Sequence, residues 1–296
     1  MERLFSALPT PFFKSEIDWE SLKKLIEMQI NNGVEGLVLS GSTGEGHSLS
    51  KEEWMEIMKF GLKISNKRAK IVAGIGFNIT SKAVEYVKIA EELGVDYILA
   101  TTPYYNKPQQ DGLYKHFENI ANETKIPIIL YNVPCRTMTD LQNETIVKLV
   151  KNFKNIVALK DATGQFDRIV DLKAKIDDVR KDFTMLSGND DTQIGFNAMG
   201  GNGVISVVSN IAPQLCRNIQ ELTKDNNFKE ALKFQNKLHQ LSKAMFCETN
   251  PVPVKYALYK LGIFRSEECR LPLVNLTDKS KEFVDFVLDR CDIYSK

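Results

Sequence analysis

The run NIVALK at residues 155–160 is apolar and β-branched, ends on a lysine, and leads directly into the polar loop DATG at residues 161–164. A continuous apolar run bounded by turn residues is typical of a parallel strand that is buried on both faces. Seven other segments have the same form, each followed by a glycine-rich or polar loop. They are LFSAL from Leu4, GLVLS from Gly36, KIVAGI from Lys70, DYILA from Asp96, IPIILY from Ile126, FTMLS from Phe183 and GVISVV from Gly203.

Amphipathic helical segments separate these runs. Asp18 is placed to cap a helix that Gly33 can end. Thr80 or Ser81 can begin another helix, which Gly94 stops. Strand–helix alternation repeated eight times predicts an α/β fold, the (β/α)8 TIM barrel, rather than an open doubly wound sheet. A Rossmann-type fold is disfavoured because no GxGxxG motif follows the first run.

The strand pattern stops after about residue 224, and three apolar helical segments follow it: Phe228–Phe246, Val254–Leu261 and Ser280–Leu288. We therefore expect two parts in this 296-residue chain. Residues 1–224 form the catalytic barrel, and residues 225–296 form a C-terminal three-helix extension.

Composition excludes several classes of function. The chain has 39 Lys and Arg against 38 Asp and Glu, so its net charge of +1 predicts no attraction to nucleic acid or to an anionic membrane. The five cysteines form no CxxC pair and the three histidines lack ligand spacing, which argues against a disulfide framework and a metal site. The N-terminus MERLFSALPTPFF lacks the long apolar core of a signal peptide, so we expect a cytoplasmic protein.

Polar residues follow the ends of the predicted strands, where catalytic groups lie in a barrel of this kind. Lys160 ends its run, and burial there should lower its pKa below the usual value of about 10.4. A neutral amine can attack a ketone and form an imine. Tyr131 ends the neighbouring run and is available as a proton donor and acceptor, with Ser42 and Tyr105 as candidates to extend a proton relay.

Two further features at the strand ends suit a carboxylate. The loop GSTGE at residues 41–45 offers backbone N–H groups and the hydroxyls of Ser42 and Thr43, although its glycines are also explained by a simple turn. Arg136 carries a guanidinium, which binds carboxylates in a bidentate manner.

The ordered motifs GSTGE, GxGxN, TPYYN, YNVPxRT, LKDATG, LSGxDD, GGxGVISV and NPxPVK resemble those of the pyruvate-dependent class I lyases typified by dihydrodipicolinate synthase. This superfamily includes the N-acetylneuraminate lyases. The similarity runs from about Leu4 to at least Leu273, which is close to the whole chain. It implies a (β/α)8 barrel with a C-terminal helical domain, usually assembled as a homotetramer built from a dimer of dimers.

The resemblance also implies a role for each matching residue. Lys160 would form the Schiff base with pyruvate, Tyr131 would transfer protons, and Ser42 and Tyr105 would complete the relay, with Tyr105 reaching into the neighbouring subunit. The substrate-binding residues that it implies are Thr43, Ile205 through its backbone, Gly188, and Arg136 for the carboxylate of L-aspartate 4-semialdehyde. No cofactor is implied beyond the covalent imine, and no metal. The product would be 4-hydroxy-tetrahydrodipicolinate, on the route to diaminopimelate and lysine.

Two alternatives remain at this stage. A related aldolase could cleave N-acetylneuraminate or a 2-keto-3-deoxy sugar acid through the same imine, with Gln165, Asn189 and Asp190 as candidate partners for a polyol. Ser42 is compatible with either enzyme, whereas Arg136 favours the synthase. A non-catalytic barrel that binds a ligand or regulates a partner would be expected to lack the lysine or the tyrosine, and both are present.

We predict weak or absent inhibition by lysine. Some members of the resembling family bind lysine at a subunit interface through an acidic side chain and histidines, beside an asparagine and a tyrosine that match Asn78 and Tyr104. Here Lys82 stands at the acidic position, and Lys51 and Trp54 replace the histidines. A cationic Lys82 repels a cationic ligand. A coupled activity assay with added lysine measures the effect, and submillimolar inhibition would contradict the prediction.

Overall fold

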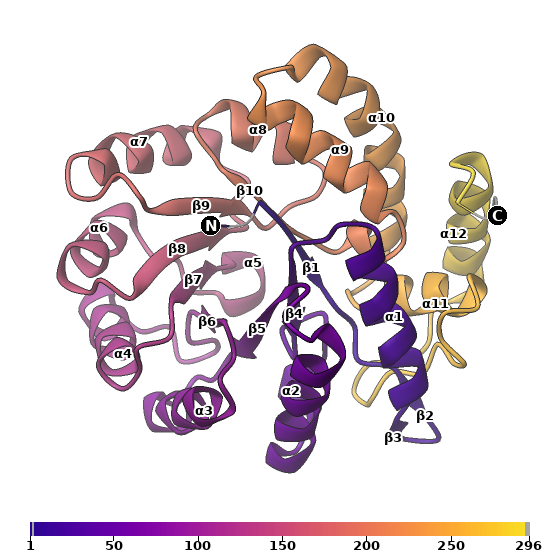
Figure 1. The fold of residues 1–296 in the computed structure, drawn as a ribbon, viewed down its shortest axis with the longest axis horizontal. Coiled ribbons are helices and arrows are strands. Elements are labelled where there is room, and N and C mark those ends of the chain that lie inside the picture. Colours follow the sequence, from indigo (N-terminus) through magenta and orange to yellow (C-terminus); the bar gives the residue numbers. More distant parts are fainter. Residues whose placement is uncertain (2, 294–296) are drawn as a thin grey trace.

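Eight parallel strands close into a barrel in the computed structural model, which describes residues 1 and 3–293. The ring order is β1-β10-β9-β8-β7-β6-β5-β4, so neighbours in the chain are neighbours in the ring (Figure 1). The strands are β1 (Leu4–Ala7), β4 (Gly36–Leu39), β5 (Lys70–Ile75), β6 (Tyr97–Thr101), β7 (Ile128–Asn132), β8 (Ile156–Asp161), β9 (Thr184–Ser187) and β10 (Gly203–Ser206). Every run predicted as a strand is one, and the TIM barrel is confirmed.

Helices surround this ring (Figure 1). They are α1 (Trp19–Asn31), α2 (Lys51–Ser65), α3 (Thr80–Leu93), α4 (Gln110–Asn122), α5 (Pro134–Thr137), α6 (Asn143–Asn152), α7 (Phe166–Asp177), α8 (Gln193–Ala198) and α9 (Pro213–Lys224). A hairpin of β2 (Phe12–Phe13) and β3 (Glu16–Ile17) precedes α1, and short 3-10 turns occupy η1 (Gly46–Ser48) and η2 (Val208–Asn210). The longer of these helices, such as α1, α4 and α6, bury apolar residues, and the strands between them are buried as well.

The helix ends follow the sequence signals with one difference. Asp18 caps α1, because its side chain accepts a hydrogen bond from Ser21 N at 3.2 Å. Gly94 ends α3 with a φ of +74°, a conformation that glycine adopts without steric cost. The helix begins at Thr80 as expected, but the Thr80 hydroxyl does not cap it and instead shares a hydrogen bond with His116 Nδ1 at 3.0 Å.

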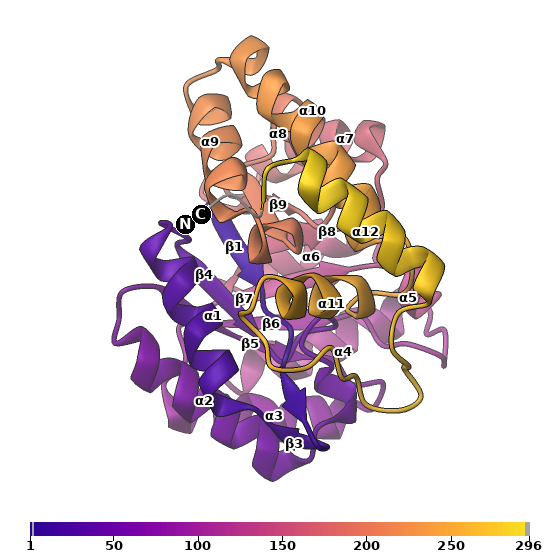
Figure 2. The same ribbon diagram turned by 90° about the vertical axis from the view of Figure 1, so that its right-hand side faces the viewer.

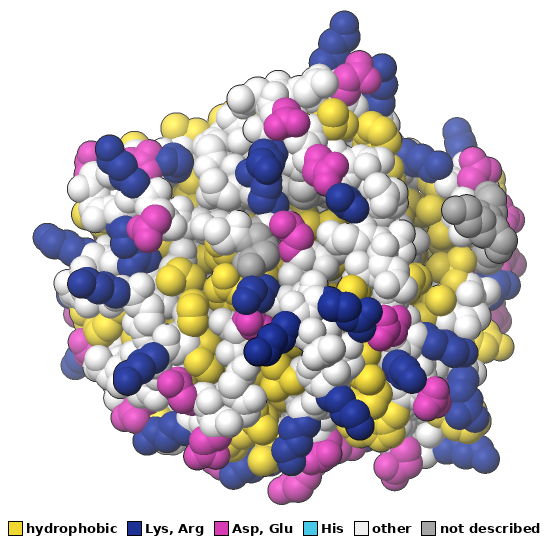
Figure 3. All heavy atoms as spheres, in the orientation of Figure 1, with side chains coloured by type: hydrophobic (Ala, Val, Ile, Leu, Met, Phe, Trp, Pro, Cys, Tyr) yellow, Lys and Arg dark blue, Asp and Glu magenta, His cyan; other side chains and the backbone are white. Residues whose placement is uncertain are grey.

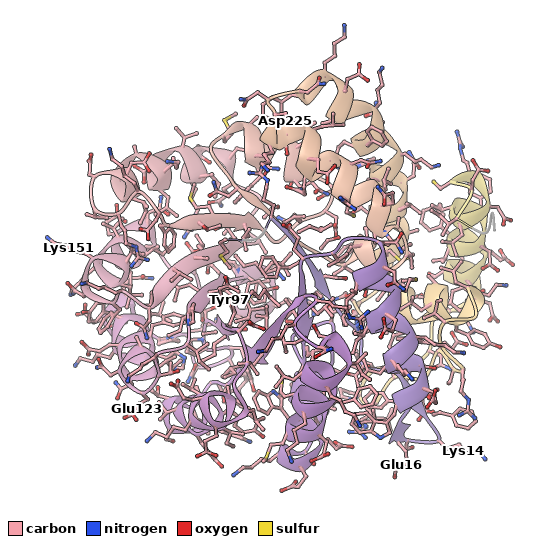
Figure 4. The ribbon with its side chains drawn as sticks, in the orientation of Figure 1. Lys14, Glu16, Tyr97, Glu123, Lys151 and Asp225 are labelled. Carbon is pink, nitrogen blue, oxygen red and sulfur yellow. The ribbon has the colours of Figure 1, made fainter. Side chains whose placement is uncertain are left out.

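The end of the barrel where the strands begin is closed by side chains. Tyr97, the first residue of β6, lies within the ring of strands in Figure 4. Its ring packs edge-on against Phe5 of β1, with 6.2 Å between the ring centroids. Tyr97 and Phe5 thus pack together near the end where the strands begin, and the catalytic groups of such barrels lie at the opposite end, where the strands finish.

Three C-terminal helices lie against one side of the barrel (Figure 2). They are α10 (Phe228–Met245), α11 (Val252–Lys260) and α12 (Asp278–Arg290), within two residues of the predicted segments. Gln235 in α10 donates a hydrogen bond from Nε2 to the backbone oxygen of Asp190 at 3.1 Å, which ties this helix to the loop after β9. The division into residues 1–224 and 225–296 stays a prediction, and its last residues, 294–296, lie outside the described part of the chain.

Charges of both signs are interspersed over the face of the molecule in Figure 3. Within residues 1 and 3–293, no helix is both long enough and apolar enough to cross a membrane.

Candidate active site

Lys160 and Tyr131 are neighbours across the pairing of β7 and β8. The parallel register sets Tyr131 opposite Lys160, so both side chains emerge at the same level near the ends of their strands. Each residue is only 6% exposed, and Lys160 Nζ lies 4.3 Å from the centroid of the Tyr131 ring. The Lys160 amine and the face of the Tyr131 ring are thus in direct contact.

Burial changes the proton affinity of the amine. It lowers the pKa of Lys160 from 10.5 to about 7, against the opposing carboxylate of Asp190 and with a smaller contribution from the Arg136 cation. Desolvation disfavours the ammonium form because the charge loses its hydration. At neutral pH a substantial fraction of Lys160 is therefore the neutral nucleophile.

The surroundings of Tyr131 keep its phenol protonated. Burial raises the pKa of Tyr131 to about 12, while the Arg136 cation and a hydrogen bond with the Ser42 side chain act in the opposite direction. A phenol with this pKa stays protonated at neutral pH and can donate to a developing alkoxide or hydroxide. The contact with Ser42 brings together the two side chains that were predicted to share a relay, and the relay itself stays a prediction.

The loop after β4 holds Ser42 and Thr43 in a tightly folded turn. Ser40 and Glu45 both have left-handed φ angles, of +53° and +51°. At Gly46 an added Cβ would stand 1.9 Å from the backbone oxygen of Ser40, so only glycine fits there. Thr43 is buried, and its Oγ1 accepts a hydrogen bond from Asn250 Nδ2 at 3.0 Å.

Arg136 lies in α5, the single helical turn directly after β7. Its Nη2 donates to the backbone oxygen of Asn250 at 3.3 Å. Asn250 therefore contacts both Thr43 and Arg136. The sequence did not lead us to predict Asn250 as a site residue. The signal was present in the NPxPVK motif, where Asn250 is the first residue, but no strand end drew attention to it.

These side chains line one cavity of about 220 Å³. Its polar lining includes Ser42, Thr43, Tyr131, Arg136, Lys160, Gly188, Asn189 and Asn250. Four of these come from strand-end loops, Tyr131 and Lys160 come from the ends of β7 and β8, Arg136 comes from α5, and Asn250 comes from the C-terminal segment. A cavity of this size with a lysine, a phenol and a guanidinium suits a small keto acid.

Two of the predicted site residues stand apart from this cavity. Tyr105 is 87% exposed and has a φ of +74°, so within a single chain its side chain reaches outward rather than toward Lys160. The side chain of Ile205 is buried in β10, and Val207, two residues further on, lines the cavity instead.

Two buried aspartates complete the surroundings of the lysine. Asp190 accepts hydrogen bonds from the Ser206 hydroxyl and from the backbone N–H groups of Val207 and Val208 at 2.8 and 3.1 Å. Burial raises the pKa of Asp190, and these hydrogen bonds oppose that shift. Asp161 accepts from the Thr163 hydroxyl at 2.5 Å. Asp161 thus bonds within its own loop, whereas Asp190 links the loop after β9 to the end of β10. The Asp190 carboxylate also opposes the loss of charge at Lys160.

A larger cavity of about 460 Å³ adjoins this one and shares Ser42 and Arg136 with it. Trp54 is buried in its wall and donates from Nε1 to the Gly74 backbone oxygen at 3.1 Å. Nearby, Lys51 pairs with Glu85 at 2.5 Å, and Lys82 Nζ lies 5.0 Å from the centroid of the Phe77 ring. Of the side chains used to predict weak inhibition by lysine, Trp54 and Tyr104 line this cavity, and Lys82 lies against Phe77, which also lines it.

The sequence model of the dihydrodipicolinate synthetase family matches residues 1–290. The chain belongs to this family. It is 42% identical over 289 residues to the 4-hydroxy-tetrahydrodipicolinate synthase of Bartonella bacilliformis, with 97% of each chain covered. It is 45% identical over 276 residues to the enzyme of the same name from Buchnera aphidicola, covering 93% of this chain and 91% of that one.

A solved structure agrees with the family assignment. The dihydrodipicolinate synthase of Aquifex aeolicus superposes with a TM-score of 0.96 at 38% sequence identity, covering 99% of both chains. The predicted family is confirmed, and family membership makes the chain an enzyme of the lyase type. In the described part of the chain, no cluster of three or more histidine, cysteine, aspartate or glutamate side chains could hold a metal ion.

Proposed function

We propose that this protein is a 4-hydroxy-tetrahydrodipicolinate synthase, which condenses pyruvate with L-aspartate 4-semialdehyde. The observation that carries the proposal is the buried Lys160 in contact with Tyr131, in a cavity that Arg136 also lines. The names of the relatives and the family membership support the same function.

The lysine and the tyrosine supply the first half of the reaction. Neutral Lys160 attacks the ketone carbon of pyruvate, and Tyr131 donates a proton to the oxygen as the carbinolamine forms and loses water. Tyr131, left as a phenolate when it protonates the departing hydroxide, then takes a proton from the methyl carbon of the protonated imine, which gives the enamine. Ser42 relays protons to and from Tyr131, a function consistent with the hydrogen bond between the two side chains.

The second substrate completes the cycle. The enamine carbon attacks the aldehyde carbon, and the aldehyde oxygen takes up a proton, which leaves the new hydroxyl. The α-amino group of the same substrate then attacks the imine carbon, closes the ring and releases the Lys160 amine. No redox step occurs and no cofactor is required, because the imine itself withdraws the electrons.

We assign the binding residues as the family resemblance implies. Thr43 and Gly188, with backbone near Ile205, hold the pyruvate carboxylate, and Arg136 holds the carboxylate of the aldehyde substrate. Since Tyr105 is exposed in a single chain, we assign it to the relay of a neighbouring subunit. We further propose, as the family resemblance implies, that the working protein is a homotetramer, a dimer of dimers, that acts on small molecules in the cytoplasm.

A sugar-acid aldolase fits less well. Of the three polar candidates for a polyol, Asp190 already uses both carboxylate oxygens for hydrogen bonds to Ser206, Val207 and Val208. Gln165 does not line the cavity that contains Lys160, and only Asn189 does. Initial rates with aspartate semialdehyde and with N-acetylneuraminate test the choice, and turnover of the sugar acid alone would overturn the proposal.

Replacing Arg136 tests the substrate assignment directly. Arg136→Met is expected to lower kcat/KM for aspartate semialdehyde about 10²-fold, because a charged hydrogen-bonding partner of the carboxylate is lost. The rate of imine formation with pyruvate alone should change far less, since pyruvate reacts at Lys160 and the Arg136 cation makes only a small contribution to the pKa of that amine. Steady-state kinetics with each substrate varied measures both effects. Arg136→Lys serves as the control that keeps the charge and loses the bidentate geometry.

A further inference from the structure

A fully buried ion pair lies where the C-terminal helices meet the loop after β4. Lys255 in α11 and Glu45 at the end of this loop are both 0% exposed, and Lys255 Nζ lies 2.5 Å from Glu45 Oε1. Burying two charges costs more free energy than their attraction returns unless further polar contacts satisfy them. Such a pair is therefore weak evidence for stability and needs another explanation.

The contacts around the pair are extensive. Glu45 Oε2 accepts a hydrogen bond from the backbone N–H of Arg270 at 3.0 Å. Arg270 itself forms a two-point ion pair with Glu53 of α2, at 2.5 and 2.7 Å. Lys255 Nζ and the Arg270 guanidinium carbon each lie 4.3 Å from the centroid of the Phe12 ring. Both oxygens of Glu45 are thus held by the C-terminal segment.

Glu45 also has an unusual backbone. Its φ of +51° lies in the left-handed region, which is unfavourable for a residue with a side chain unless the surroundings impose it. Its N–H donates to the Ser42 backbone oxygen at 3.3 Å, and its own backbone oxygen accepts from Ser48 N at 2.8 Å. The side-chain contacts with Lys255 and Arg270 therefore act on the residue that closes the turn around Ser42.

The same C-terminal segment contacts the loop at a second point. Asn250, five positions before Lys255, donates to Thr43 Oγ1 at 3.0 Å. The backbone of this segment is continuous with α11, where Lys255 N donates to the Pro251 oxygen at 3.0 Å. Thr43 and Ser42 thus lie between two attachments to the C-terminal helices, one at Thr43 and one at Glu45.

We propose that Lys255 and Glu45 are positioning residues, which hold Ser42 and Thr43 in place for catalysis through the turn at Glu45. This inference rests on the proposed function of Thr43 in binding pyruvate and of Ser42 in the proton relay. Neither Lys255 nor Glu45 lines the cavity that contains Lys160, so both act through the loop.

Lys255→Met tests the proposal first. It removes the charge and keeps the linear stem, and we expect KM for pyruvate to rise about tenfold and kcat to fall about tenfold, because misplaced contacts lose binding and orientation. KM for aspartate semialdehyde should stay within about twofold, since Arg136 binds that substrate. Lys260→Met is the matched control, because Lys260 is on the same helix in a surface ion pair with Asp285.

The double variant separates positioning from stability. Lys255→Met with Glu45→Gln contains no unpaired buried charge, so its melting temperature should return to within about 5 °C of the wild type. The raised KM for pyruvate should persist, because the link between the loop and α11 is still absent. If the melting temperature and both kinetic constants recover together, the pair serves stability alone and the proposal is overturned. Unchanged pyruvate KM in the single variant would also overturn it.

Borohydride trapping distinguishes this proposal from the proposed function. If the wild type forms no pyruvate adduct at Lys160, the proposed function itself fails. If the wild type forms the adduct and Lys255→Met forms it at the wild-type rate and pyruvate dependence, only the positioning proposal fails.

Discussion

Lys160→Met is expected to abolish the adduct that borohydride fixes between the protein and pyruvate, and to lower kcat by on the order of 10³-fold or more. Methionine has a similar length and no nucleophilic nitrogen, so the covalent route is closed while the cavity keeps its shape. Peptide mass mapping after reduction measures the adduct, and initial rates measure kcat. An adduct that persists in this variant would place the imine on another lysine.

The control for this variant changes a lysine in the turn just before β8. Lys154→Met changes an exposed lysine shortly before β8 and should leave the adduct at Lys160 unchanged. Lys160→Met should also fold at least as well as the wild type, because burial of the amine lowers its pKa from 10.5 to about 7. The unfolded chain binds this proton more tightly, so the buried amine opposes folding at neutral pH.

The same pKa determines the pH dependence of the wild type. Below a pKa of about 7, Lys160 is increasingly protonated and cannot attack the ketone. The rate of imine formation should therefore fall roughly tenfold for each pH unit well below this pKa and level off above it. Single-turnover trapping with pyruvate, over a pH range of about two units on either side of this pKa, measures the profile. A flat profile would contradict the assignment of the neutral amine.

Tyr131→Phe is expected to lower kcat by about 10²- to 10⁴-fold, the usual contribution of a positioned proton donor and acceptor. The phenyl ring keeps the contact with Lys160, while the hydroxyl and its hydrogen bond with Ser42 are lost. Pyruvate should still form the borohydride adduct, only more slowly, and its KM should change little. Single-turnover and steady-state rates separate these effects.

A matched variant at the other end of the barrel controls for loss of a tyrosine hydroxyl. Tyr97→Phe alters a tyrosine in the adjacent strand β6, at the closed end where it packs against Phe5. We expect its kcat to stay within about twofold of the wild type. Equal losses of activity in both variants would indicate a general effect on the barrel and not a proton transfer by Tyr131.

Most of the barrel was predictable because its signal is local. A strand such as NIVALK is apolar on both faces, and its length and boundaries are visible in the sequence. Helix ends were predictable for the same reason, as at Asp18 and Gly94. The side-chain partner of Thr80 was not, because His116 is 36 residues away in the chain.

The sequence by itself determined the fold class and a candidate nucleophile, since both depend on patterns within short segments and on the rule that strand ends meet at one edge of a barrel. The sequence also predicted a lowered pKa at Lys160 and Tyr131 on the neighbouring strand, and the tertiary structure added the extent of the burial and the register that sets Tyr131 opposite. Only the tertiary structure decided the contacts of Asn250 with Thr43 and Arg136. The physical reason is that desolvation and hydrogen bonding between distant segments depend on distances in space. The ion pair of Glu45 and Lys255, separated by 210 positions in the chain, is the clearest instance.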